Sequence, residues 1–136
     1  MEKLRVKAIM DNYDKCISFI EEQLQKSGFD NKAIIKVVTA CEEIIVNVMN
    51  YAYSPKEGEL DIVFEDDVDA VKITFVDNGN PFNPLDNPDV DITLPVDQRE
   101  IGGLGILMVK KFMDDVNYEY KNHQNILTVM KRHLSK

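Results

Sequence analysis

A long run of apolar residues at helical spacing is the feature that most restricts how this chain folds. Between Ile34 and Ala52, apolar side chains recur at intervals of three and four residues, and Asp30 precedes them as an N-cap. The pattern predicts one long amphipathic helix with a wide apolar face. Such a face is buried only against a second layer of structure, so the rest of the chain has to supply that layer.

The apolar pattern changes from helical to alternating after this helix. Residues 60–64 and 71–75 alternate and predict a hairpin that turns at Asp66 and Asp67. The same reasoning predicts the remaining elements: a strand at 4–8, helices at about 11–27 and 105–113, and a second hairpin at 116–120 and 126–130.

This order of elements predicts an α+β fold. We expect a two-layer α/β sandwich, in which helices cover one face of a mixed, mostly antiparallel sheet. A length of 136 residues favours a single domain, 1–136. Residues 81–101 hold four prolines and show no periodicity. Long loops of this kind are usually functional, so we predict a lid there, and the alternative is an insertion without a role.

Composition excludes several classes of partner and location. The formal net charge of −8 repels phosphate backbones and anionic lipid, so we expect neither nucleic acid nor membrane as a partner. No apolar stretch approaches the roughly 18 residues of a membrane span, and residues 1–10 lack a signal peptide's apolar core. Cys16 and Cys41 lie outside any CxxC motif and predict buried, reduced thiols. These features predict a cytoplasmic protein.

Glu43 and Asn47 form the first of three segments whose residue types carry chemistry. They stand four residues apart on the predicted long helix, so they point the same way, about 6 Å apart along its axis. A carboxylate there can accept a proton, and an amide oxygen can bind a hard cation. Taken alone, the pair favours the solvated face of an amphipathic helix, because it lies away from the centre of the apolar face.

The second segment, residues 77–81, directly follows a predicted strand. Asp77 can accept a hydrogen bond from an exocyclic amino group such as that of adenine. Gly79 allows a flat ring to approach the backbone closely, and Pro81 stiffens the exit. Taken alone, the Asp-Asn-Gly sequence slightly favours a plain turn.

The third segment places Gly102, Gly103, Leu104 and Gly105 directly before a predicted helix. Free backbone N–H groups at a helix start bind phosphate, while the glycines can also act as a hinge for a lid. The sequence contains neither the GxxxxGK[ST] motif of P-loop proteins nor a GxGxxG motif after its first strand.

With these three segments in this order, the chain resembles the anti-sigma factor serine/threonine kinases. They are a stand-alone branch of the Bergerat-fold ATPases, which include gyrase, chaperone, mismatch-repair and histidine-kinase ATP-binding domains. The resemblance runs from the first predicted strand to the last. It implies the Bergerat ATP-binding fold, with ATP (or ADP) and Mg²⁺ as ligands.

The resemblance also implies roles for individual residues. Glu43 is then the general base that acts on a partner's hydroxyl group, and Asn47 holds Mg²⁺. Asp77 binds the adenine amino group, and the second glycine-rich segment meets the phosphates from the lid side. The implied nucleotide ligands are Asn47, Asp77, Gly79, Pro81, Gly102, Gly103, Leu104 and Gly105.

The chain departs from the family pattern at three places. Tyr51 stands where the family often has histidine, at the phosphate end of the site. Asn83 stands where the family often has aspartate, in the lid. The family often has a threonine near the adenine on one of the last two strands; here Asn125 and Thr128 are both candidates, and the sequence does not decide between them.

Two functions follow from the resemblance. The first is an ATP-binding anti-sigma factor with serine/threonine protein kinase activity, which phosphorylates a STAS-type anti-anti-sigma partner, sequesters a sigma factor and forms a homodimer. The alternative is a non-catalytic, ATP-gated protein-binding module in a partner-switching pathway. The ATPase half of a histidine kinase is disfavoured, because the sequence shows no dimerising helix pair with a phospho-acceptor histidine.

Overall fold

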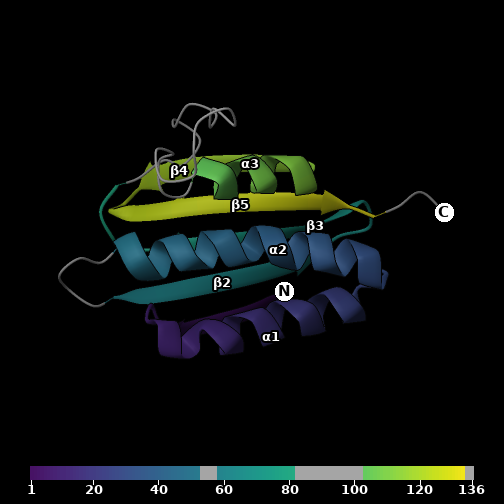
Figure 1. The fold of residues 1–136 in the computed structure, drawn as a ribbon, viewed down its shortest axis with the longest axis horizontal. Helices are drawn as coiled ribbons and strands as arrows, with labels where there is room; N and C mark the ends of the chain where they lie inside the picture. The colour runs from purple at the N-terminus through teal and green to yellow at the C-terminus, as the bar shows by residue number, and fades with distance from the viewer. Residues whose placement is uncertain (53–57, 82–102, 134–136) are drawn as a thin grey trace.

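The computed structural model describes residues 1–52, 58–81 and 103–133, with the backbone alone at 51–52 and 103–106. The described residues form a five-stranded sheet with helices on one face (Figure 1), so the predicted α+β class is confirmed. The elements in chain order are β1 (Glu2–Lys7), the 3-10 turn η1 (Met10–Asn12), α1 (Tyr13–Lys26), α2 (Asn31–Asn47), the π-helical turn η2 (Val48–Ala52), β2 (Glu59–Asp66), β3 (Ala70–Asp77), α3 (Gly103–Phe112), β4 (Asp115–Lys121) and β5 (Gln124–Arg132).

The strands lie in the order β1-β2-β3-β5-β4, and each of the four neighbouring pairs is antiparallel. We expected a mixed, mostly antiparallel sheet. Strands β3 and β4 do run in the same direction, because both are antiparallel to β5. Since β5 lies between them, they do not pair, and the described sheet is antiparallel throughout.

Alternation along the strands sorts side chains between the two faces of the sheet. On β2, Leu60, Ile62 and Phe64 join the core beneath the helices, and each is at most 2% exposed. Asp61 and Val63 alternate with them and point to the helix-free face, where they are only partly buried. The core therefore lies entirely between the sheet and the helices.

Helix α2 is the central helix, lying between α1 and α3 over the sheet (Figure 1). Val37, Cys41 and Ile45 on its apolar face are fully buried. Its N-cap is Asp30, whose carboxylate accepts a hydrogen bond of 2.8 Å from the backbone N–H of Ala33, as predicted. The α-helix ends at Asn47 and continues as the π-helical turn η2, where the sequence predicted α-helix to residue 52.

The turn between β4 and β5 is a tight two-residue turn. Lys121 pairs with Gln124, and the intervening Asn122 and His123 have φ angles of 54° and 63°. Positive φ at both positions matches the twist of an antiparallel hairpin. A side chain in this conformation is strained, and His123 bears that strain where glycine is usual.

The helical layer is chemically inert in its interior. Cys16 on α1 and Cys41 on α2 are free, fully buried thiols. Burial raises the pKa of Cys16 to about 11 and also raises that of Cys41, so neither is a thiolate at neutral pH.

In the described part of the chain, no helix has both the length and the apolar character needed to cross a membrane.

Candidate functional site

The chemistry-bearing segments of the sequence meet at one end of the molecule. Strand β3 ends there at Asp77 and β5 begins there, while α2 ends at Asn47 and α3 begins at Gly103. These four ends of strands and helices lie toward the left of Figure 1. The antiparallel sheet and the helices over it therefore bring together residues that are far apart in the sequence.

Asp77 is a buried carboxylate, only 6% exposed. Its Oδ1 atom accepts hydrogen bonds from the Gly79 backbone N–H at 2.8 Å and from Asn125 Nδ2 at 2.9 Å. Burial raises the pKa of Asp77, although these two hydrogen bonds act in the opposite direction. Among the described residues, no cation pairs with it.

The second oxygen of Asp77 is the atom that remains for a ligand. Both hydrogen bonds from described residues end on Oδ1, so Oδ2 accepts none from this part of the chain. No buried side-chain oxygen among the described residues lacks a hydrogen-bond partner, so Oδ2 keeps some exposure and a ligand can reach it. An exocyclic amino group is a hydrogen-bond donor, so this end of β3 fits an adenine base.

Asn125 lies beside Asp77, and Thr128 does not. Asn125 is directly opposite Asp77 in the β3–β5 ladder, and its Nδ2 also donates to the backbone oxygen of Asn80 at 2.9 Å. Thr128 is three residues further along β5, so it points to the other face. There its hydroxyl lies 3.3 Å from that of Thr74. Of the two candidates from the sequence, Asn125 is the one at the site.

Tyr118 on β4 is a residue at this site that the sequence analysis missed. Its hydroxyl donates a hydrogen bond to Asn125 Oδ1. The alternation of β4 predicts only which face Tyr118 occupies. Its contact with Asn125 depends on the pairing of β4 with β5, which no local pattern reveals.

Two adjacent glutamates on α2 have different surroundings. Glu42 points toward α1, where the hydroxyl of Tyr13 interacts with it; burial and then the charge of Glu42 raise the pKa of Tyr13. Glu43 is one residue, or about 100°, further around the helix. It is partly buried, and no described residue forms a hydrogen bond or ion pair with it. The charge of Glu43 also raises the pKa of Tyr13, although less than that of Glu42 does, so the two glutamates differ in that only Glu42 hydrogen-bonds to Tyr13.

Asn47 stands one turn beyond Glu43, at the last residue of α2 before the π-helical turn. Its side chain is also partly buried. Within the described ranges, no three His, Cys, Asp or Glu side chains gather at metal-binding distances. Mg²⁺ commonly takes one or two oxygen ligands from the protein and the rest from phosphates and water. The amide of Asn47 fits that role only alongside a bound phosphate.

The glycine-rich segment begins α3 two residues earlier than predicted. Gly103, Leu104 and Gly105 form the first turn of the helix instead of preceding it. The N–H groups of a first turn have no partner within the helix, so they can bind an anion. Gly102 and most of the predicted lid lie outside the described residues, as do Asn83 and the side chain of Tyr51. Pro81, the last described residue before the lid, is exposed.

A hollow of about 420 Å³ lies at the same end of the sheet, on the face that the helices do not cover. Arg5 and Asp61 lie opposite each other on the helix-free face, and their side chains form a paired contact of 2.7 and 3.0 Å within it. Neither Glu43 nor Asn47 lines the hollow, but Asp77 does, so the hollow adjoins the candidate nucleotide site at the end of β3. Its lining residues are Arg5, Gly58, Glu59, Asp61, Val76, Asp77, Asn78 and Gln124.

Comparison with known proteins decides the family. Residues 6–131 match the family described as histidine kinase-like ATPase domain. The chain belongs to this family. The match spans the described elements from the end of β1 to the end of β5, so it includes each of the three segments at the site.

Curated relatives narrow the resemblance to one branch. The chain is 27% identical over 115 residues to a protein named serine-protein kinase RsbW from Oceanobacillus iheyensis, covering 81% of this chain and 72% of the relative. It is 30% identical over 106 residues to the protein of the same name from Bacillus cereus, covering 75% of this chain and 66% of the relative. The predicted resemblance to anti-sigma factor kinases is confirmed. The chain spans about two thirds of the length of the Bacillus cereus protein.

Solved structures confirm the fold. The RsbU and RsbW domains of a Mycobacterium tuberculosis protein align with a TM-score of 0.63 at 14% identity, over 97% of this chain and 32% of that one. The Acinetobacter baumannii histidine kinase AdeS aligns with a TM-score of 0.55 at 13% identity, over 99% of this chain and 70% of that one. At such identities the likeness concerns the fold alone.

Proposed function

We propose that this chain is an ATP-dependent serine/threonine protein kinase of the anti-sigma type. Its substrate is a STAS-type anti-anti-sigma protein, and it also sequesters a sigma factor. The observation that carries the proposal is that α2 and β3 end, and α3 begins, at the same end of the fold, which is the end that carries Asn47 and Asp77, with Glu43 one turn before Asn47. The serine-protein kinase names of the relatives support the same assignment.

Recognition of the nucleotide begins at Asp77. Its ionised Oδ2 accepts a hydrogen bond from the 6-amino group of adenine, while Oδ1 stays bound to Gly79 and Asn125. Backbone N–H groups in the first turn of α3 bind the phosphates. Asn47 supplies an oxygen ligand to Mg²⁺, which offsets the negative charge of the phosphates when it is bound.

Phosphoryl transfer then needs a base at the other side of the phosphates. The serine hydroxyl oxygen of the partner attacks the γ-phosphorus, and the bond from that phosphorus to the departing ADP oxygen breaks. Glu43 takes the proton released from the hydroxyl. Glu42 does not compete for this role, because its side chain interacts with Tyr13 on α1.

The test compares two neighbouring variants, Glu43→Gln and Glu42→Gln. Each is incubated with Mg²⁺, γ-labelled ATP and purified STAS-domain proteins of the same organism, and phosphoserine is measured. We expect Glu43→Gln to lower the transfer rate by about 10²- to 10⁴-fold and to keep its affinity for ATP. The Glu42→Gln control keeps the wild-type rate, because Glu42 faces α1.

The outcomes separate the two functions that the sequence left open. Tight ATP binding by the wild type without transfer to any STAS protein would replace the kinase by the ATP-gated binding module. Full transfer by Glu43→Gln would remove Glu43 as the base. The proposal also treats residues 1–136 as one domain that acts in the cytoplasm as a homodimer. Sedimentation equilibrium of the purified chain tests the dimer.

A further inference from the structure

Three side chains from three strands form a hydrogen-bonded chain behind the Asp77 carboxylate. Tyr118 on β4 donates its hydroxyl hydrogen to Asn125 Oδ1 on β5. Asn125 Nδ2 then donates to Asp77 Oδ1 on β3 at 2.9 Å. The same Nδ2 reaches the backbone oxygens of Asn80 at 2.9 Å and Gly79 at 3.4 Å. One amide therefore connects the carboxylate to the turn that follows it.

Burial makes the orientation of this amide matter. Asn125 is only 6% exposed, so a polar atom of its side chain that lost its partner would stay unsatisfied. Its NH₂ group faces two acceptors, Asp77 Oδ1 and the Asn80 oxygen, while its carbonyl faces the Tyr118 hydroxyl. Reversing the amide would set its oxygen against those two acceptors. Tyr118 is the described residue that donates to the carbonyl end of this amide.

We propose that Tyr118 is a positioning residue for nucleotide recognition, acting through Asn125 to hold the Asp77 carboxylate and the Gly79–Asn80 turn in the geometry that reads a 6-amino purine. This inference rests on the proposed function and adds a residue outside all three sequence segments. Tyr118 does not touch the base in this scheme. It holds the side-chain amide of Asn125, and that amide holds the Asp77 carboxylate.

The selectivity of Asp77 between purine bases depends on how many of its carboxylate oxygens remain to accept a hydrogen bond. Gly79 and Asn125 both occupy Asp77 Oδ1, so Oδ2 alone is left to meet the ligand. A purine without the 6-amino group covers Oδ2 and leaves it unpaired, which costs far more than a missing contact on a solvated surface. A carboxylate that shifts or rotates loses this selectivity before it loses the rest of the nucleotide site.

The test measures this selectivity in the Tyr118→Phe variant. Affinities for ATP and for purine riboside 5′-triphosphate, which lacks the amino group, are measured by calorimetry. We expect the wild type to prefer ATP by about 10- to 100-fold. In Tyr118→Phe the preference falls several-fold, mainly through weaker ATP binding, and affinity for the analogue stays at the wild-type value. An unchanged preference, or an equal loss for both ligands, overturns the proposal.

Tyr120→Phe is the matched control. Tyr120 lies two residues along the same strand, directly opposite Asn125 in the β4–β5 ladder, and is 42% exposed. No described residue accepts or donates a hydrogen bond at its hydroxyl. We expect Tyr120→Phe to keep the preference for ATP. If both variants lose it equally, the role belongs to the strand as a whole and not to Tyr118.

A second readout needs no nucleotide. Carboxyl carbon NMR follows the titration of Asp77 in the ligand-free protein. Removing the Tyr118 hydroxyl loosens the donation from Asn125, so the pKa of Asp77 rises in Tyr118→Phe and not in Tyr120→Phe. An unchanged pKa in Tyr118→Phe overturns the inference even if ATP binds. If the wild type binds no ATP, the proposed function fails, and the titration still decides whether Tyr118 positions Asp77.

Discussion

The two ends of the β2–β3 hairpin carry carboxylates in opposite situations. Asp66, at the end of β2, accepts a hydrogen bond of 2.9 Å from His133 Nε2 and a further one from Ser27. Burial acts to raise the pKa of Asp66, but together these contacts hold it below its usual value. Asp77, at the end of β3, is buried without a described cationic partner, and burial raises its pKa.

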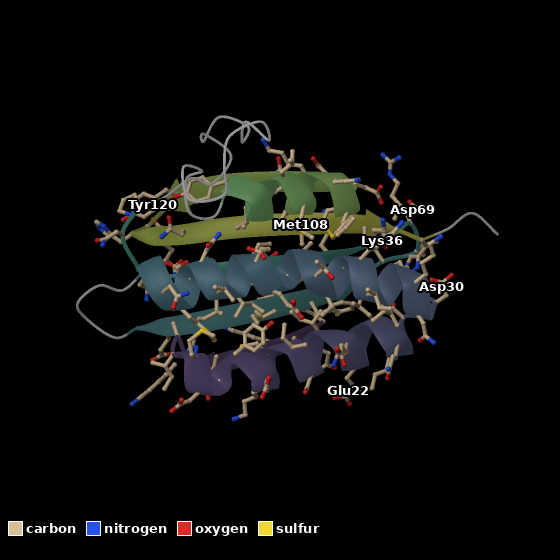
Figure 2. All side chains as sticks on the ribbon, in the orientation of Figure 1. Glu22, Asp30, Lys36, Asp69, Met108 and Tyr120 are labelled. Carbon is tan, nitrogen blue, oxygen red and sulfur yellow. The ribbon has the colours of Figure 1, made fainter. Side chains whose placement is uncertain are left out.

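The surroundings repeat this contrast. The His133 end comprises Ser27, Phe29, Asp66, Asp69 and His133. The ring of His133 stacks on that of Phe29, with 4.8 Å between the ring centres. The backbone N–H of His133 donates a hydrogen bond of 2.9 Å to the backbone oxygen of Asp69. Figure 2 labels Asp69 at this end and Tyr120 at the opposite, Asp77 end. Polar groups at the His133 end therefore pair with one another, whereas both described hydrogen bonds to Asp77 end on Oδ1 and none ends on Oδ2.

The largest expected effect is that of Asp77→Asn on ATP binding. An amide at this position either turns its NH₂ group toward the adenine amino group or loses the contact with Asn125, so we expect affinity to fall about 100-fold. Isothermal calorimetry measures it, and Asp66→Asn serves as the control with unchanged affinity. Thermal unfolding without nucleotide should show no loss of stability in Asp77→Asn. An equal loss of ATP affinity in the two variants would contradict the difference proposed between Asp66 and Asp77.

The pH dependence of ATP binding sharpens the same contrast. The ionised form of Asp77 accepts the hydrogen bond, so we expect affinity to weaken by up to about tenfold per pH unit below its raised pKa. The stability of the ligand-free fold responds in the opposite sense. A raised folded-state pKa contributes stability that is complete below the unfolded-state pKa and is lost as pH rises through the folded-state value. Calorimetry from neutral pH into the acid range checks this. The remaining affinity of Asp77→Asn should lack this titration.

The smallest expected effect is that of Asp66→Asn on stability. The side chain of Asp66 is 44% exposed, so its pairing with His133 is worth about 0.2–1 kcal/mol. Because its pKa is lowered, this contribution is present above the unfolded-state pKa and is lost as pH falls through the folded-state value. Urea unfolding at low and high salt measures it. A loss several times larger, or one indifferent to salt and pH, would contradict a solvated pair.

Much of the fold follows from local patterns. The periodicity of α2 and the alternation of both hairpins place the core face of each element, and Asp30 marks the start of α2. The same patterns do not separate the α-helix from the π-helical turn after Asn47, because apolar residues at spacings of three and four suit both. Nor do they show that β5 separates β3 from β4.

The site is harder to predict than the fold, because its details depend on pairings between distant strands. Asp77 lies where the sequence predicts a turn at a strand end, so its position follows from local pattern. The choice of Asn125 over Thr128 depends on the β3–β5 register, and the contact of Tyr118 depends on the β4–β5 register. The different surroundings of Glu42 and Glu43 depend on how α1 packs against α2.

The pairing of Asp77 with Asn125 also bears on how the protein is made. Asn125 follows Asp77 in the sequence by 48 residues, on the last described strand. A nascent chain that ends anywhere between them contains the residues of β2, β3, α1 and α2, yet the carboxylate has no amide partner. On the ribosome, the purine recognition that we propose for Asp77 therefore has to wait until β5 has been synthesised and has inserted beside β3. Under this proposal, nucleotide binding marks a chain whose sheet is complete.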